Sequence, residues 1–195
     1  MNMIYDPKKH HRRSIRLKGY DYSQPGAYFI TVCSQNRECI FGTIQDDKMI
    51  LNRFGQVVEE KWNNIPKHFP HTRNDTLGVM PNHIHGIIFI IDLGAKHSMP
   101  NFSCYSNNTI LNASPLQGRP RGTKSGSLSA NMQNYLSVTT RKINQLRRTP
   151  GAQLWQRNYY KHIIRNEKDL NKIREYIIHN ALKWELDRNH PNHWK

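Results

Sequence analysis

Residues 79 to 91 read Val79-Met80-Pro81-Asn82-His83-Ile84-His85-Gly86-Ile87-Ile88-Phe89-Ile90-Ile91. The apolar run that ends this stretch is β-branched and aromatic, which is typical of a strand, and Pro81-Asn82 before it is typical of a turn. Apolar residues occupy both alternating faces of the run, so the strand is predicted to be covered on both sides and central in its sheet.

His83 and His85 stand one residue apart where this strand begins. Because successive strand side chains alternate between faces, the two imidazoles point the same way, and imidazoles about 6 to 7 Å apart on one face can share a metal ion. An HxH pair also occurs as two histidines packed at a strand end. The pair alone leaves both interpretations open.

Hydrophobic periodicity and turn residues predict the remaining elements. The predicted strands cover residues 28–34, 39–44, 49–51, 76–80, 83–91 and 154–165, and the predicted helices cover residues 52–69, 127–148 and 166–186. This order is typical of a ferredoxin-like α+β fold. We expect an antiparallel sheet with helices on its faces, an extra β-hairpin and one additional helix at the C-terminal end.

The chain of 195 residues has 29 Lys and Arg against 14 Asp and Glu, a net charge of +15. Such a surplus favours a polyanionic partner, most often nucleic acid, although a merely basic protein has the same composition. Three cysteines, Cys33, Cys39 and Cys104, form no CxxC pair, which argues against a disulfide framework and a zinc ribbon. No apolar run approaches the ~20 residues of a membrane span, and no signal peptide is recognised, so a cytoplasmic protein without a membrane partner is predicted.

Composition divides the chain into four parts. Residues 1–18 form a basic arm, which either lies on phosphates or is a solvated tail. One domain is predicted at 19–188, with an insertion at 94–127 that is rich in Gly, Ser, Asn and Pro and is expected to be mobile in part. Residues 189–195 form a short tail.

The predicted C-terminal helix carries a polar flank beside its apolar stripe. On a helical wheel Tyr176 and Asn180 lie on this flank, outside the residues needed for the core. Lys172, His179 and Lys183 share the flank with the phenol. A phosphate group would be stabilised beside these cations.

Three motifs in this order carry a family resemblance. They are His83-Ile84-His85 after Met80-Pro81-Asn82, Leu154-Trp155-Gln156-Arg157-Asn158-Tyr159-Tyr160-Lys161-His162-Ile163-Ile164-Arg165-Asn166, and Arg174-Glu175-Tyr176-Ile177-Ile178-His179-Asn180. Together they resemble the IS200-like single-tyrosine (Y1) transposases with an HUH motif, especially the REP-associated tyrosine transposase branch. The resemblance runs from about Arg16 to about Trp184, so the domain at 19–188 is interpreted as a Y1 transposase domain.

The resemblance implies a metal-dependent enzyme that cleaves and rejoins single-stranded DNA at hairpins through a 5′-phosphotyrosine. By motif position Tyr176 is the nucleophile, and His83, His85 and Asn180 bind Mg²⁺ or Mn²⁺. A hard divalent cation accepts an amide oxygen and waters, and imidazoles suit Mn²⁺ better than Mg²⁺. A homodimer is left open, because IS200-like relatives include dimers and the REP-associated branch includes monomers.

Several further residues have alternative roles. Tyr159 and Tyr160 compete with Tyr176 as nucleophile; in a strand, one of the two would be core and the other could stack on a base. His162 and His179 could assist proton transfer or be plain surface histidines. The candidate phosphate contacts, each of which could equally be an ordinary surface charge, are Arg157, Arg165, Lys172, Lys183, Arg119 and Arg121.

Two other classes of function compete with the enzyme. The first is a non-catalytic, domesticated protein that binds DNA or RNA hairpins and has kept the fold and the charge. The second is a basic RNA-binding ferredoxin-like domain, which would show exposed aromatic residues on an open sheet face in place of a metal site.

Overall fold

The computed structural model describes residues 20–92 and 123–193. The basic arm at 1–18, most of the insertion at 94–127, and Arg119 and Arg121 therefore lie outside the described residues. The predicted division of the chain into arm, domain, insertion and tail stays a prediction.

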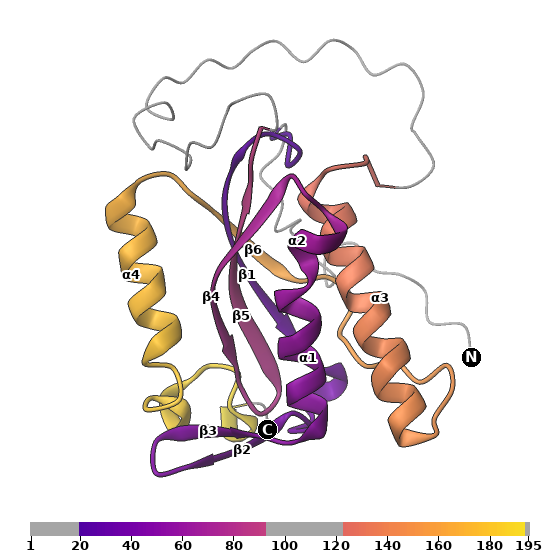
Figure 1. Cartoon of the computed structure of the whole chain (residues 1–195). Coiled ribbons are helices and arrows are strands. Elements are labelled where there is room, and N and C mark those ends of the chain that lie inside the picture. Colours follow the sequence, from indigo (N-terminus) through magenta and orange to yellow (C-terminus); the bar gives the residue numbers. More distant parts are fainter. Residues whose placement is uncertain (1–19, 93–122, 194–195) are drawn as a thin grey trace, which may run out of the picture.

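The sheet has four antiparallel strands in the order β4-β5-β1-β6. Their bounds are β1 (Gly26–Cys33), β4 (Thr72–Val79), β5 (His83–Ile90) and β6 (Tyr160–Ile164). Helices α1 (Arg53–Asn63), α2 (Ile65–His68) and α3 (Leu128–Arg147) lie on one side of the sheet, and α4 (Glu167–Ile178) lies on the other (Figure 1). The predicted ferredoxin-like α+β fold with a C-terminal helix is confirmed.

A separate two-stranded hairpin, β2 (Gly42–Gln45) with β3 (Lys48–Leu51), is the predicted extra hairpin. Short 3-10 helices cover Gln35–Arg37, Trp184–Leu186 and Pro191–His193. None of the helices in the described ranges combines the length and the apolar composition that a membrane span requires.

Helices α1, α3 and α4 begin where the sequence supplies a capping side chain. Asn52 accepts from the backbone N–H groups of Phe54 and Gly55 at the start of α1. Ser127 caps α3 in the same way, and Asn166 caps α4 by accepting from the backbone N–H of Asp169. Each cap satisfies backbone donors that would otherwise have no partner, so these starts are fixed locally.

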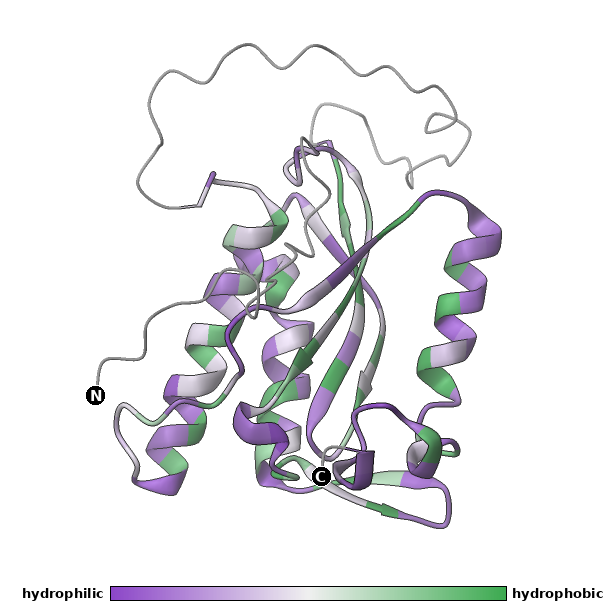
Figure 2. Ribbon diagram, turned by 180° about the vertical axis from the view of Figure 1, so that it is seen from behind, coloured by the Kyte–Doolittle hydropathy of each residue, from purple (hydrophilic) through white to green (hydrophobic). Residues whose placement is uncertain are grey.

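The central strand β5 is buried at every position, as its two-sided apolar pattern predicts. Ile84, Ile88 and Ile90 pack in the larger core with α1 and α3, whereas Ile87 and Phe89 pack in a smaller core with α4. Green, hydrophobic stretches mark the central strands, whereas hydrophobic and hydrophilic residues alternate along the helices (Figure 2). The side chains of His83 and His85 have the parity of Ile87 and Phe89, so they face α4.

Gly86, between the second histidine and the apolar run, allows the Trp62 ring to pack closely against β5. A Cβ built at Gly86 would stand 2.5 Å from two ring atoms of the fully buried Trp62. We expect Gly86→Ala to lower the free energy of unfolding by about 1–3 kcal/mol, because a rigid buried indole cannot give way. Urea unfolding measures the loss. In a Trp62→Leu background the same change should cost clearly less, and equal costs in both backgrounds would contradict the clash.

Several predicted boundaries are wrong; the strand predicted over 76–80, for example, begins at Thr72. The helix predicted over 52–69 is divided at Asn64 into α1 and α2, with Pro66 in the first turn of α2. The strand predicted over 154–165 is regular only at 160–164, because Trp155 packs into the larger core and donates to Thr139 Oγ1 at 2.9 Å, and Asn158 adopts a φ of 69°.

The predicted C-terminal helix ends at Ile178, well before residue 186. After Ile178 the backbone tightens into i to i−3 hydrogen bonds, for example from the Asn180 N–H to the Ile177 carbonyl at 3.3 Å. Trp184 then packs against His83, with 6.0 Å between the centroids of the two rings. Tertiary contact overrides a locally helical pattern here, and it turns the end of the chain back toward the histidine pair.

Candidate active site

The two histidines of β5 meet at their Nε2 atoms, which are 2.9 Å apart in a buried environment. The Nδ1 atom of His85 lies 2.8 Å from Thr31 Oγ1 on the neighbouring strand β1, and the Phe29 ring stacks on the same imidazole at 5.5 Å between centroids. The His85 ring is therefore held in place from the side away from its Nε2 atom. This arrangement is typical of histidines prepared for metal binding.

The hydrogen bonds around Asn82 fix the tautomer of His83. The Asn82 Nδ2 atom donates to the backbone carbonyls of Arg37, at 3.1 Å, and Asn189, at 2.8 Å. Its Oδ1 atom is then the acceptor for the Nδ1–H of His83 at 2.8 Å. The Nε2 atom of neutral His83 consequently carries a lone pair that faces His85 Nε2. A proton or a cation must lie between the two nitrogen atoms, because two facing lone pairs would repel each other.

Burial keeps both imidazoles neutral. It lowers the pKa of His83 to about 3, with smaller contributions from the charges of Arg37 and Arg188. It also lowers the pKa of His85 well below the usual value, and the neighbouring His83 adds to the effect. Neutral imidazole is the form that binds metals, so the pair stays competent as a ligand at mildly acidic pH.

The low pKa of His83 predicts acid sensitivity of the metal-free protein. Below about pH 6.5 the unfolded chain binds a proton at His83, whereas the folded chain does not bind this proton until about pH 3. The contribution of His83 to the free energy of unfolding is therefore fully present above about pH 6.5 and is lost as the pH falls. Between pH 7 and pH 5 the loss from His83 should be about 2 kcal/mol in urea unfolding. A His83→Gln variant should show a shallower loss, and an equal loss would contradict the assignment.

Tyr176 reaches the pair from α4. Its hydroxyl lies 3.2 Å from His85 Nε2, and the side chain is 44% exposed, so it meets both the histidines and solvent. Burial raises the pKa of this phenol to about 12, the charge of Asp187 raises it further, and the charge of Arg188 lowers it. Tyr176 is therefore a neutral phenol at physiological pH unless positive charge is added to the site.

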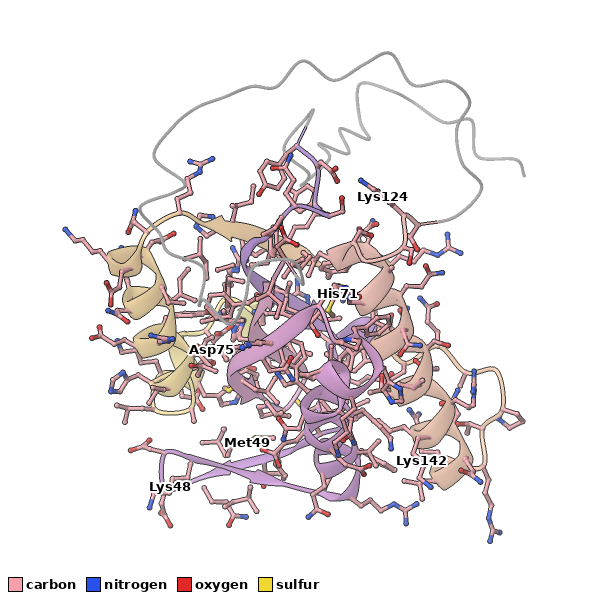
Figure 3. All side chains as sticks on the ribbon, turned by 45° about the horizontal axis from the view of Figure 1, so that its top comes forward. Lys48, Met49, His71, Asp75, Lys124 and Lys142 are labelled. Atoms are coloured by element: carbon pink, nitrogen blue, oxygen red, sulfur yellow. The ribbon has the colours of Figure 1, made fainter. Side chains whose placement is uncertain are left out.

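Two features of β4 hold α4 at this distance. Gly78 permits close packing, since a Cβ there would stand 2.8 Å from Ile177 Cγ2. Asp75, labelled in Figure 3, accepts a bidentate pair of hydrogen bonds from Arg174, with Nε to Oδ1 at 2.9 Å. Arg174 stands two residues before Tyr176, so this ion pair fixes the part of α4 that carries the phenol.

Oxygen donors come from the segment after α4. The carboxylate of Asp187 and the two imidazoles form a buried group whose ligand atoms lie within 4.8 Å of one another. Asp187 Oδ2 accepts from Asn180 Nδ2 at 3.0 Å and lies 4.0 Å from His83 Nε2. The Oδ1 atom of Asn180 is buried without a hydrogen-bond partner among the described residues.

These groups fit a hard divalent cation. Two neutral nitrogen atoms, a carboxylate and an unsatisfied amide oxygen form a mixed donor set of the kind that Mn²⁺ accepts. Ligands at about 2.1 Å in octahedral geometry stand roughly 3 Å from each other, which agrees with the Nε2 to Nε2 separation of 2.9 Å. The site could therefore bind a metal ion.

The sequence analysis missed Asp187. Had the helix continued to residue 186, Asp187 would lie about 16 Å along the axis from Tyr176. The chain reverses instead, and composition does not single out one of 14 acidic residues. Arg188 was missed for the same reason, although its charge acts on His83, His85 and Tyr176.

The structure separates Tyr159 from Tyr160. Tyr159 packs against the larger core with α1 and α3. Tyr160 lies on the α4 face, is 36% exposed, and contacts Phe29 at 6.2 Å between ring centroids, with the Arg188 guanidinium 5.7 Å above its ring. Tyr176, at 3.2 Å from His85 Nε2, is thus the tyrosine that reaches the histidine pair.

The remaining predicted site residues are exposed or make other contacts. Lys172 and Lys183 are exposed, as is Arg165 between β6 and α4. His162 pairs with Asp169 at 3.0 Å, and His179 Nδ1 lies 2.9 Å from the Glu175 carbonyl oxygen. Arg157 lines a cavity beside α3.

Comparison with known proteins gives two informative similarities. A protein of Haemophilus influenzae that is described as uncharacterized is 41% identical over 189 residues, which are 96% of this chain and 98% of that protein. The structure of a REP-associated tyrosine transposase bound to a REP hairpin matches with a TM-score of 0.53 and 16% identity, over 89% of this chain and 74% of that one. No family model matches the chain.

The first similarity is close enough to establish kinship, and the second, at 16% identity, establishes the fold. The fold likeness agrees with the resemblance of the His83, Tyr160 and Tyr176 motifs. The chain therefore belongs to one family with the Haemophilus influenzae protein, and its fold is that of the REP-associated tyrosine transposase.

Proposed function

We propose that this protein is a metal-dependent DNA transposase, a single-strand endonuclease that cleaves single-stranded DNA at hairpins and rejoins it through a 5′-phosphotyrosine. One observation carries the proposal: the hydroxyl of the partly exposed Tyr176 lies 3.2 Å from His85 Nε2, at a buried His-His-Asp group. The net charge of +15 supports a nucleic acid substrate. The similar fold of a transposase that was solved with a REP hairpin adds support for hairpin DNA.

In the proposed reaction Tyr176 Oη attacks a backbone phosphorus atom of the DNA. The bond from oxygen to phosphorus forms as the bond from phosphorus to the 3′ oxygen breaks, and the phenolic proton is in net balance transferred to that 3′ oxygen. The products are a 5′-phosphotyrosine and a 3′-hydroxyl. Because the ester conserves the bond energy, attack by another 3′-hydroxyl rejoins a strand without ATP.

His83, His85, Asp187 and the amide oxygen of Asn180 would hold Mg²⁺ or Mn²⁺. The bound ion supplies positive charge, which neutralises the phosphate oxygens and favours the phenolate. That supply matters here, because the pKa of Tyr176 is otherwise raised to about 12.

Arg188 and Tyr160 form a second set of contacts on the same face. The charge of Arg188 lowers the pKa of Tyr176, so this guanidinium favours the phenolate and would attract the phosphate. The exposed ring of Tyr160 lies beneath the same guanidinium and offers a surface on which a base next to the cleaved phosphate would stack.

A direct test is incubation with a pool of structured single-stranded oligonucleotides and MnCl₂, followed by denaturing gels and mass spectrometry of the peptide that contains Tyr176. We expect a nucleotide adduct on that peptide, and none with EDTA. Hairpin binding without any adduct under these conditions would support the non-catalytic hairpin-binding protein instead.

A further inference from the structure

A cavity is lined by residues of α3 and of the loop after it. Helix α3 lies on the side of the sheet opposite to α4 (Figure 1). The volume of the cavity is about 840 Å³, within the range of sites that bind small organic ligands. It lies between the C-terminal half of α3 and the loop that returns to β6 at residues 148–158. None of the proposed active-site residues lines it.

The chemistry of the lining matches an unpaired nucleotide. Three arginines, Arg141, Arg148 and Arg157, line the cavity, and its lining residues include no carboxylate. Leu136, which is partly exposed, and Pro150, which is exposed, add apolar surface. Guanidinium groups bind phosphates, and an apolar surface accepts the face of a base.

The same cavity is lined by amide side chains that could contact a base edge, namely those of Asn144, Gln145, Gln153, Gln156 and Asn158. Asn144 is only 6% exposed, and its Oδ1 atom has no hydrogen-bond partner among the described residues. Every nucleobase presents an N–H donor that such an acceptor can bind. The wall thus contains an unsatisfied acceptor beside the arginines.

The walls are held by hydrogen bonds. Asn144 Nδ2 donates to the Ala152 carbonyl at 2.6 Å, and the Trp155 indole donates to Thr139 Oγ1 at 2.9 Å, which ties the returning loop to α3. Arg148 ends the helix in the left-handed region with a φ of 57°. A pre-formed cavity loses less conformational entropy when a ligand binds.

The cavity continues toward the active site. A second cavity of about 440 Å³ shares Gln153, Gln156 and Arg157 with it and reaches Gln35 and Asn36. The backbone N–H of Gln156 donates to the carbonyl of Cys33 at 2.9 Å, and Cys33 is the strand partner of His83. A chain of nucleotides that follows these cavities would therefore approach the end of β5 that carries the histidines.

We propose that this arginine-lined cavity binds unpaired nucleotides of the single-stranded DNA on which the enzyme acts. The inference rests on the proposed function for the identity of the substrate, but it concerns a different surface. The bases lie against the apolar wall, and the phosphates contact Arg141, Arg148 and Arg157.

The alternative is that these arginines only complement the C-terminal end of the α3 dipole. A double variant, Arg141→Gln with Arg148→Asn, separates the two, since asparagine tolerates the left-handed conformation at residue 148. The probe is a fluorescent random-sequence oligonucleotide of about 20 nucleotides, with a duplex of equal length as reference. Anisotropy gives the affinity of the full chain for each probe at several salt concentrations.

We expect the double variant to bind the single strand at least about 10-fold more weakly, with a salt slope smaller by about 1.4 for two lost phosphate contacts. The matched control is Lys67→Gln with Lys142→Gln, which removes equal charge from two exposed residues near Glu60 that do not line the cavity; Lys142 is labelled in Figure 3. This control should change single-strand affinity by no more than about 2-fold. Melting temperatures confirm that both variants fold.

The inference is overturned if the control weakens single-strand binding as much as the cavity variant, if the cavity variant binds like the parent, or if only duplex binding is lost. Because the readout is binding, it is independent of cleavage. Selective loss of binding in a protein that forms no tyrosine adduct would reject the proposed function and keep the cavity site. Adduct formation with unchanged single-strand binding in the cavity variant would keep the proposed function and reject the cavity site.

Discussion

Tyr176→Phe is expected to abolish the covalent DNA adduct, with cleavage reduced by at least about 10³-fold, while the affinity for single-stranded DNA stays within a few-fold of the parent. The substitution removes one oxygen atom from a side chain that is 44% exposed, so folding should be unaffected. The oxygen removed is the atom that lies 3.2 Å from His85 Nε2. Denaturing gels measure the adduct, and anisotropy measures the affinity.

Tyr160→Phe is the matched control, because the same atom is removed from a partly exposed tyrosine on the same face of the sheet. It should keep the adduct, since the stacking surface of its ring is unchanged. A persistent adduct in Tyr176→Phe, together with its loss in Tyr160→Phe, would show that Tyr160 is the nucleophile.

His83→Ala and His85→Ala are each expected to remove metal-dependent cleavage and to weaken Mn²⁺ binding by more than about 100-fold. Loss of a group that only orients a ligand already costs about 10- to 100-fold, so loss of a ligand should cost more. Isothermal titration measures Mn²⁺ affinity, and thermal unfolding with and without MnCl₂ measures the stabilisation that binding to the folded state supplies. The control is His68→Ala, which changes an exposed histidine on α2.

Asp187→Asn extends this test to the residue that the sequence analysis missed. It keeps the shape of the side chain and removes its charge, so Mn²⁺ affinity should fall by about 10-fold or more if the carboxylate is a ligand. Asn180→Ala, measured beside it, tests the predicted amide ligand. Unchanged Mn²⁺ affinity in all four variants would leave the histidines as a packed pair at a strand end.

The order of strands and helices could be predicted because each element has a local cause. The apolar run after His85 predicts a strand covered on both faces, and β5 is buried throughout. Caps at Asn52, Ser127 and Asn166 stand at the predicted helix starts. Periodicity and capping act over a few residues, so they can be recognised in the sequence.

The residues around the histidines could be predicted only in part. His83 and His85 are adjacent in the sequence, and the motif resemblance singles out Tyr176, which the structure places 3.2 Å from His85. Asp187 could not be predicted, because its position depends on where α4 ends. That end is decided by the contacts of Trp184 with His83 and His190, at 6.0 and 4.8 Å between ring centroids, which no local pattern records.

The sequence by itself determined the positive charge, the β5 strand with its two imidazoles on one face, and the tyrosine on the last helix. Only the tertiary structure decided that the chain turns back after Ile178, so that Asp187, Asn180 and Arg188 join those imidazoles. It also formed the arginine-lined cavity, whose walls come from α3 and the loop after it. The physical reason is that side-chain direction follows from local backbone geometry, whereas convergence of distant side chains depends on packing between elements.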